Sequence, residues 1–131
     1  MLTFGALGGV ITGKFYVAGG MDANGLASTK LDVYNPATNS WKALASMPSA
    51  QLPLAGAVIN NKLYIIEGDS KKVYAYDPVT NRWTTRAPML TARWNLAAAS
   101  LVTQYGNHKI LAVGGYTSDE RGYTANELYT P

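Results

Sequence analysis

An internal repeat constrains this sequence more than any other feature. A phrase of eight residues occurs three times, as GKFYVAGG at residues 13–20, NKLYIIEG at 61–68 and HKILAVGG at 108–115. Its lysine recurs at intervals of 48 and then 47 positions (62 − 14 and 109 − 62). Self-similarity at a period of this size indicates a repeat architecture, in which each unit buries its apolar surface on its neighbours.

A second phrase follows each copy of the first. It contains a tyrosine two residues before a proline, and the tyrosines are Tyr34, Tyr76 and Tyr129. In the first two copies it continues into Asn-x-Trp, which ends at Trp41 and Trp83, 42 positions apart (83 − 41). A methionine adjacent to a proline then follows in both copies. Chance does not explain two phrases that recur together at nearly constant spacing.

Each unit alternates short apolar runs with turn residues, which is the pattern of antiparallel strands. Asn-Asn and Gly-Asn pairs occupy the expected hairpin turns, and Pro and Asn occupy the turns that follow the tyrosines. We expect innermost strands over residues 10–11 and 55–59, second strands over 15–17 and 63–66, third strands over 31–34 and 73–76, and fourth strands that begin at Trp41 and Trp83.

The repeat resembles the kelch motif, whose unit of about 50 residues forms one four-stranded blade of a β-propeller. The double glycine, the Tyr-x-Pro turn, the Asn-x-Trp and the Met–Pro pair carry this resemblance, and the second copy departs from it with Glu67–Gly68. The resemblance implies an all-β fold of antiparallel four-stranded blades, about three per chain. Blade 1 is expected over about residues 1–47, blade 2 over about 48–88, and an incomplete blade 3, without its outer strand, over about 89–131.

Three blades do not close a ring, because propellers usually have 4–8 blades. Two interpretations stay open. The chain is a segment of a longer propeller protein whose remaining blades lie elsewhere, or two chains form a homodimer that completes a six-bladed ring. Exposed sheet edges and blade faces promote aggregation, which favours the homodimer.

Composition argues against several classes of function. Charged residues make up 15% of the chain, below the roughly 25% of ordinary soluble domains, which favours a surface covered by neighbouring blades or chains. A net charge of +3 does not by itself indicate nucleic-acid binding, and the absence of cysteine excludes disulfides and thiolate zinc sites. Residues 1–10 do not read as a signal peptide, and no apolar run approaches the roughly 20 residues of a membrane span. We expect no nucleic-acid partner and no membrane partner, and the compartment stays open.

No cluster of residues has catalytic or metal-binding spacing. His108 is the only histidine, and it occupies the repeat position of Gly13 and Asn61. A Gly-x4-Gly-Lys sequence ends at Lys14, but Phe15 stands where a phosphate-binding loop needs a hydroxyl for magnesium. We therefore predict a protein that is not an enzyme, with no metal and no cofactor.

Loops between the second and third strands are the best candidates for a binding site, because loops on a rigid scaffold often carry function. Those over residues 21–30 and 116–126 are longer than the equivalent loop of the second repeat. The kelch resemblance implies that such loops line a ligand-binding face. It also implies that an arginine placed like Arg93 contacts acidic peptides, which suits the guanidinium fork. The candidate ligand-binding residues are Asp22, Asn24, Arg93, Trp94, Asp119, Arg121 and Tyr123.

Structural roles compete with these assignments. The long loops are alternatively solvated connectors, and Arg93 is alternatively a hydrogen-bond donor between blades. Trp41 and Trp83 are expected to be packing residues, because they recur at the same position of the repeat.

Three functions stay open. A protein- or peptide-binding module is the main hypothesis, supported by the repeat and the variable loops. A carbohydrate-binding or carbohydrate-active propeller is an alternative, since Trp94, Tyr116 and Tyr123 could stack on sugar rings. A structural fragment of a larger propeller is the third. An exposed aromatic shelf flanked by carboxylates would favour sugar, whereas a basin rimmed by arginine would favour an acidic peptide.

Overall fold

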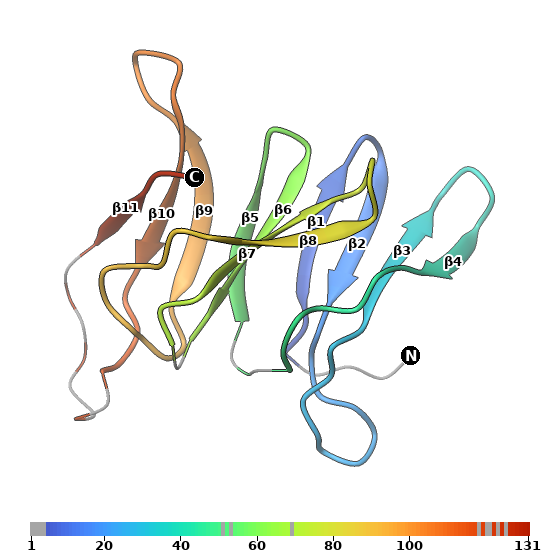
Figure 1. Cartoon of the computed structure of the whole chain (residues 1–131), viewed down its shortest axis with the longest axis horizontal. Coiled ribbons are helices and arrows are strands. Elements are labelled where there is room, and N and C mark those ends of the chain that lie inside the picture. Colours follow the sequence, from blue (N-terminus) through green and yellow to red (C-terminus); the bar gives the residue numbers. More distant parts are fainter. Residues whose placement is uncertain are drawn as a thin grey trace.

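The structure of this chain is a computed structural model that describes residues 5–50, 52, 54–68, 70–117, 119, 122, 124 and 126–131. Within these residues, eleven strands form three antiparallel sheets (Figure 1). The same residues contain no helix of the length and apolarity needed to cross a membrane. The three antiparallel sheets confirm the all-β fold predicted from the repeat.

Each sheet is one blade, and its strands are hydrogen-bonded to one another in chain order. The predicted strands are all present, and each extends by one to three residues beyond the expected range. Blade 1 contains β1 (Leu7–Ile11), β2 (Lys14–Ala18), β3 (Leu31–Asn35) and β4 (Ser40–Ala43). Blade 2 contains β5 (Leu54–Ile59), β6 (Lys62–Glu67), β7 (Val73–Asp77) and β8 (Arg82–Arg86). Blade 3 contains β9 (Ala97–Val102), β10 (His108–Val113) and β11 (Glu127–Tyr129).

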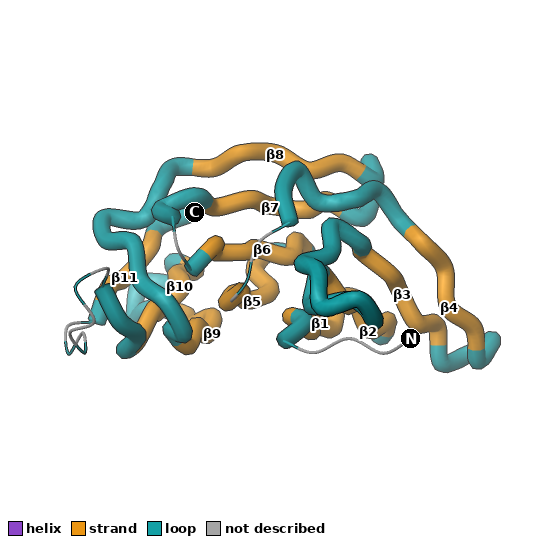
Figure 2. Tube along the Cα trace, turned by 90° about the horizontal axis from the view of Figure 1, so that it is seen from below, coloured by secondary structure: helices purple, strands orange, loops and turns teal. Residues whose placement is uncertain are grey.

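The blades stand side by side along an arc that is open on one side (Figure 2). The first strands of the blades, β1, β5 and β9, lie on the concave side, and β5 contacts both of the others. Strands β4 and β8 lie on the convex side. Linkers over residues 44–53 and 87–96 lead from the outer strand of one blade to the first strand of the next.

The hairpin turns follow the asparagine signals of the sequence. Asn60 and Asn61, between β5 and β6, have φ angles of 50° and 58°, which a two-residue type I′ turn requires at both central positions. Asn39 and Asn81 also have positive φ, 48° and 53°, before β4 and β8. Asparagine tolerates this left-handed conformation better than most residues, so these positions define where the strands reverse.

Two apolar cores lie between the blades, because successive side chains of a strand point to opposite faces of the sheet. In β6, Leu63 and Ile65 face blade 1, and Tyr64 and Ile66 face blade 3. All four are almost completely buried. A middle blade therefore contributes to both cores, whereas a terminal blade buries only one of its faces within the described chain.

A polar contact at the convex side joins blade 2 to blade 1. The indole N–H of Trp83 donates to the carbonyl oxygen of Ala45 (2.8 Å), and Asn81 Oδ1 accepts from the N–H of Ala45 (3.0 Å). Tyr76 donates its hydroxyl to the same Asn81 oxygen (2.8 Å) and packs its ring 5.2 Å from that of Trp83. The expected packing role of Trp83 is confirmed.

The same expectation is wrong for Trp41, whose side chain is 54% exposed. Trp41 occupies in blade 1 the position that Trp83 occupies in blade 2, and its face of the sheet points away from blade 2. The chain as described has no blade on that side, so the packing partner that the repeat position implies is not there.

Candidate functional site

The two ends of the blades differ in the length of their connections. One end carries the hairpin turns between first and second strands and between third and fourth strands. The other end, at the lower side of Figure 1, carries the long loops of blades 1 and 3 and both linkers. This second end, which we call the loop end, is where side chains from different segments meet.

Two exposed aromatic residues are joined through their backbones at the loop end of blade 3. The backbone N–H groups of Trp94 and Tyr116 donate to each other's carbonyl oxygens, over 2.8 and 2.9 Å, in an isolated antiparallel bridge. Residues directly opposite in such a pair project their side chains to the same side, with Cβ atoms about 4.5–5.5 Å apart. Trp94 is 52% exposed and Tyr116 is 51% exposed. We call these two residues the aromatic pair.

A buried ion pair fixes the segment that carries Trp94. Arg93 is only 1% exposed, and its Nη2 atom lies 3.2 Å from Glu127 Oε2, at the start of β11. Its Nη1 atom donates to the carbonyl oxygen of Gly114 (3.2 Å), and Glu127 Oε1 accepts from the N–H of Leu90 (2.5 Å). Both halves of the linker are thereby tied to the strands on either side of the β10–β11 loop.

Gly115 permits the loop to approach the linker. Its φ angle is 93°, and a Cβ atom at this position would lie 2.6 Å from the carbonyl oxygen of Trp94 and 3.2 Å from Arg93 Cβ. Only glycine combines this backbone conformation with such a close approach. The second glycine of the repeat phrase is therefore required here for the position of the aromatic pair.

The candidate ligand residues fall into two separate groups. Trp94 and Asp119 belong to blade 3, where the Asp119 carboxylate accepts a hydrogen bond from the Thr117 hydroxyl. Asp22 and Asn24 belong to the β2–β3 loop of blade 1, and blade 2 stands between the two groups (Figure 1). Within one chain, the structure therefore does not bring all candidates into one site. Arg121 and Tyr123, the remaining candidates, lie outside the described residues.

Asp22 organises its own loop. Its Oδ1 atom accepts hydrogen bonds from the backbone N–H groups of Asn24 (2.8 Å) and Leu26 (3.0 Å). The hydrogen bonds from Leu26 and then Asn24 hold the pKa of the Asp22 carboxyl below its usual range. Because this carboxylate is exposed, it remains open to solvent while it shapes the turn.

Arg93 is not positioned as a surface group. Its side chain is buried, and the contacts described above hold it to Gly114 and Glu127 of its own blade. The sequence does not indicate this, because Glu127 lies 34 residues further along the chain. Its direct contact with a ligand stays a prediction, and the geometry instead makes Arg93 a residue that positions Trp94.

Sequence reasoning did not assign a role to Glu67, the residue that interrupts the double glycine of the second repeat. Its carboxylate is buried and accepts hydrogen bonds from the hydroxyls of Ser49 and Ser70, the latter over 3.0 Å. Its equivalents Gly19 and Gly114 have positive φ, 66° and 69°, and lead into longer loops. In blade 2 the strand continues through Glu67, and its side chain anchors the short loop and the preceding linker.

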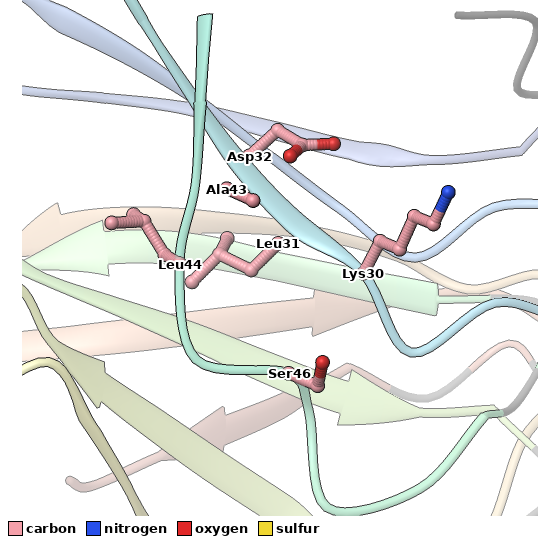
Figure 3. A pocket seen from close by; sticks show the side chains of 6 residues that line it. All are labelled: Lys30, Leu31, Asp32, Ala43, Leu44 and Ser46. Atoms are coloured by element: carbon pink, nitrogen blue, oxygen red, sulfur yellow. The ribbon is translucent and has the colours of Figure 1, made fainter.

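A shallow pocket of about 290 Å³ lies on blade 1 (Figure 3), whereas the aromatic pair belongs to blade 3. In blade 2 the repeat position of Asp32 is occupied by Tyr74, which is buried. The pocket is lined by Lys30, Leu31, Asp32, Ala43, Leu44 and Ser46.

The described residues contain no group of three or more histidine, aspartate or glutamate side chains that could hold a metal ion. Among the described residues, Arg93, which forms the ion pair with Glu127, lies next to Trp94 in the chain, and Asp119 follows Tyr116 by three residues. The two exposed aromatic residues supply a surface on which a flat ligand can stack. It is therefore suited to binding.

Comparison with known proteins agrees with the fold. The solved structure of YjhT superposes with a TM-score of 0.74 at 18% sequence identity, over 98% of this chain and 52% of that chain. At this identity the likeness concerns the fold alone, and the present chain spans about half the length of YjhT. No curated protein sequence matches the chain significantly. The Kelch motif matches residues 3–48 and 53–90, so the chain belongs to the kelch-repeat family.

Proposed function

We propose that this chain is a kelch binding module whose ligand contacts the aromatic pair at the loop end of blade 3. The observation that carries the proposal is that Trp94 and Tyr116 are both exposed and are paired through two backbone hydrogen bonds. Large exposed aromatic groups are costly to leave in water and are typical of binding surfaces. The Arg93–Glu127 ion pair and Gly115 keep this surface in place before a ligand arrives, which lowers the entropic cost of binding.

The ligand class that this geometry supports best is a carbohydrate. A pyranose ring has a flat face of C–H groups, which stacks on an aromatic side chain, and hydroxyl groups around its edge, which need hydrogen-bond partners. The aromatic pair supplies the stacking surface, and the carboxylate nearest to Tyr116 in the sequence is Asp119, three residues later, which we propose as an acceptor for the hydroxyl groups. The alternative of an acidic peptide bound by Arg93 has less support, because that guanidinium is buried in an ion pair.

A peptide or protein ligand is the second candidate. Leu90 is exposed on the same linker as Trp94, four residues before it, and exposed apolar side chains can contact apolar groups of a partner. In this case the aromatic pair would act as the central anchor of a protein interface. The two candidates differ in the ligand and agree on the residues that bind it.

The test is a titration of the purified chain with a panel of neutral and acidic disaccharides and with a random peptide pool. Tryptophan fluorescence and calorimetry report binding. We expect disaccharides to bind and Trp94→Ala to weaken their affinity at least 10-fold, because the stacking surface is lost. Tyr105→Ala is the control, since Tyr105 is an aromatic residue that is more exposed than Trp94 and lies in the β9–β10 turn at the opposite end of the same blade.

The outcomes separate the possibilities. Binding of peptides and not of disaccharides, still sensitive to Trp94→Ala, would move the assignment to the second candidate. Binding that is unchanged in a folded Trp94→Ala variant would show that the aromatic pair is not the site.

A further inference from the structure

The β2–β3 loop of blade 1 carries an asparagine–glycine pair, Asn24–Gly25. Asn24 is the only asparagine of the sequence that is followed by glycine. Such a pair is prone to lose the side-chain amide of its asparagine, because glycine has no Cβ atom to hinder attack by its backbone nitrogen on the neighbouring side chain. The pair is therefore a candidate site of covalent modification.

The tip of this loop is open to solvent. The loop extends from the loop end of blade 1 (Figure 1), and every residue from 22 to 26 is exposed. Among the described residues, a Cβ atom added at Gly25 would approach only Met21 Sδ, at 3.9 Å. Water and hydroxide therefore reach the Asn24–Gly25 pair directly.

Hydrogen bonds to Asp22 close the loop into a short turn. The backbone N–H of Gly25 donates to the carbonyl oxygen of Asp22 over 3.0 Å. The side-chain oxygen Oδ1 of Asp22 accepts from the backbone N–H groups of Asn24 (2.8 Å) and Leu26 (3.0 Å). An aspartate that binds backbone groups ahead of it in this way stabilises a turn, so Asp22 holds both neighbours of Gly25 in place.

The closed turn restrains the nitrogen that would react. The Gly25 nitrogen can attack only after it has lost its proton, and in the closed turn this proton is bound by the Asp22 carbonyl oxygen. The two hydrogen bonds to Asp22 Oδ1 also restrain the backbone around the pair. The reaction therefore requires local opening of the turn, and the strength of the Asp22 contacts sets how often the turn opens.

We propose that Asn24 is a site of spontaneous deamidation and that the Asp22 carboxylate controls its rate. In the open turn, the deprotonated Gly25 nitrogen forms a bond to Asn24 Cγ. The bond between Cγ and Nδ2 then breaks, ammonia leaves with the proton, and a cyclic succinimide remains. Water opens the ring at Cγ to give aspartate, or at the backbone carbonyl carbon to give isoaspartate. The net change is the gain of a water molecule and the loss of an ammonia molecule, with no oxidation or reduction.

The modification would change the charge and the shape of the loop. An amide becomes a carboxylate, so the net charge of +3 falls by one. The new carboxylate lies two residues from Asp22, and like charges at this separation repel. Isoaspartate also adds an atom to the backbone at the residue whose N–H binds Asp22. Both products would thus loosen the turn, and this consequence does not depend on the function proposed for blade 3.

The test follows the purified full chain during incubation for several weeks at mildly alkaline pH. Peptide mass spectrometry locates the mass increase of about 1 Da, and chromatography separates aspartate from isoaspartate peptides. We expect Asn24 to convert at least about 10-fold faster than Asn39, Asn61 or Asn107, which are exposed and are followed by residues with a Cβ atom. A chain unfolded in guanidinium chloride should convert Asn24 faster still, because its turn is open.

Two variants test the role of Asp22. Asp22→Ala removes the acceptor and should accelerate conversion of Asn24 at least about 5-fold in the folded chain. Ser28→Ala is the matched control, because it removes another side-chain acceptor of the same loop, which binds the N–H of Lys30 over 3.2 Å. Its conversion rate should equal that of the wild type. Circular dichroism confirms that each variant folds.

Two further variants exclude other causes. Asp22→Asn keeps an acceptor oxygen and loses the negative charge, so its rate should stay close to that of the wild type. Asn24→Gln should abolish conversion at this position, because the longer side chain would have to close a larger ring.

Four results would overturn the proposal. The first is a folded chain in which Asn24 stays intact while the unfolded chain converts. The second is conversion at Asn39, Asn61 or Asn107 as fast as at Asn24. The third is an unchanged rate in Asp22→Ala, or an equal acceleration in Ser28→Ala. The fourth is an equal acceleration in Asp22→Asn, which would attribute the control to charge rather than to hydrogen bonding.

Discussion

Trp83 of blade 2 donates its indole N–H to the carbonyl oxygen of Ala45, in the linker that leaves blade 1 (2.8 Å). The two residues are 38 positions apart and belong to different blades. In blade 3 the hydroxyl of Tyr129 binds the carbonyl oxygen of Ala87, the repeat equivalent of Ala45, over 2.7 Å. Blades 2 and 3 thus each bind the linker that leaves the blade before them, and these hydrogen bonds help to fix how neighbouring blades pack.

Truncation of Trp83 should destabilise the chain far more than truncation of Trp41. Trp83→Ala removes a large side chain packed against the first core and should lower the free energy of unfolding by about 3 kcal/mol. Trp41→Ala should cost less than about 1 kcal/mol in the monomer, because this side chain is half exposed. Urea denaturation followed by circular dichroism measures both. Equal losses in the two variants would contradict the assignment of Trp83 to the contact between blades.

A methyl group at Gly115 should displace the aromatic pair. Gly115→Ala places a Cβ atom 2.6 Å from the carbonyl oxygen of Trp94, in addition to the strain of a positive φ. Gly106→Ala is the matched control, because Gly106 has a positive φ of 77° and nothing within 4 Å of the added atom. We expect Gly115→Ala to change the fluorescence of Trp94 and to weaken ligand binding at least 10-fold, and Gly106→Ala to do neither. The same response in both variants would attribute the effect to backbone strain alone.

Alkaline pH should destabilise the chain through Tyr76. Burial, with smaller contributions from nearby Tyr16 and Asp77, raises the pKa of Tyr76 to about 12 from its ordinary value of 10.0. Because the folded pKa lies above the unfolded pKa, the stabilisation is complete below pH 10 and is lost as pH rises from about 10 to 12. The loss amounts to roughly 2–3 kcal/mol at two pKa units.

Tyr76→Phe isolates this contribution. The variant should be less stable at pH 7, because the hydrogen bond to Asn81 is lost, and its stability should fall less steeply between pH 10 and 12. Tyr105→Phe, at an exposed position, should keep the wild-type dependence. Urea denaturation at a series of pH values gives both slopes, and equal slopes for wild type and Tyr76→Phe would refute the effect.

The amino-acid sequence alone determined the positions of the strands and turns in this protein. The repeat spacing, the Asn60–Asn61 turn and the Tyr-x-Pro turns define where strands begin and reverse, because strand pairing within a blade is local and turn conformation depends on the turn residues themselves. The blade count and the incomplete third blade follow from the same periodicity.

Only the tertiary structure decided which side chains are available to a ligand. Arg93 is buried because Glu127 arrives from 34 residues away, and Tyr116 stands beside Trp94 because Gly115 lets two separate segments approach. Trp41 and Trp83 share one repeat position, yet one is exposed and the other is packed. Equivalent positions of a repeat carry similar residues in every copy. Whether such a residue is buried depends on which blade packs against that copy, and only the tertiary structure shows this.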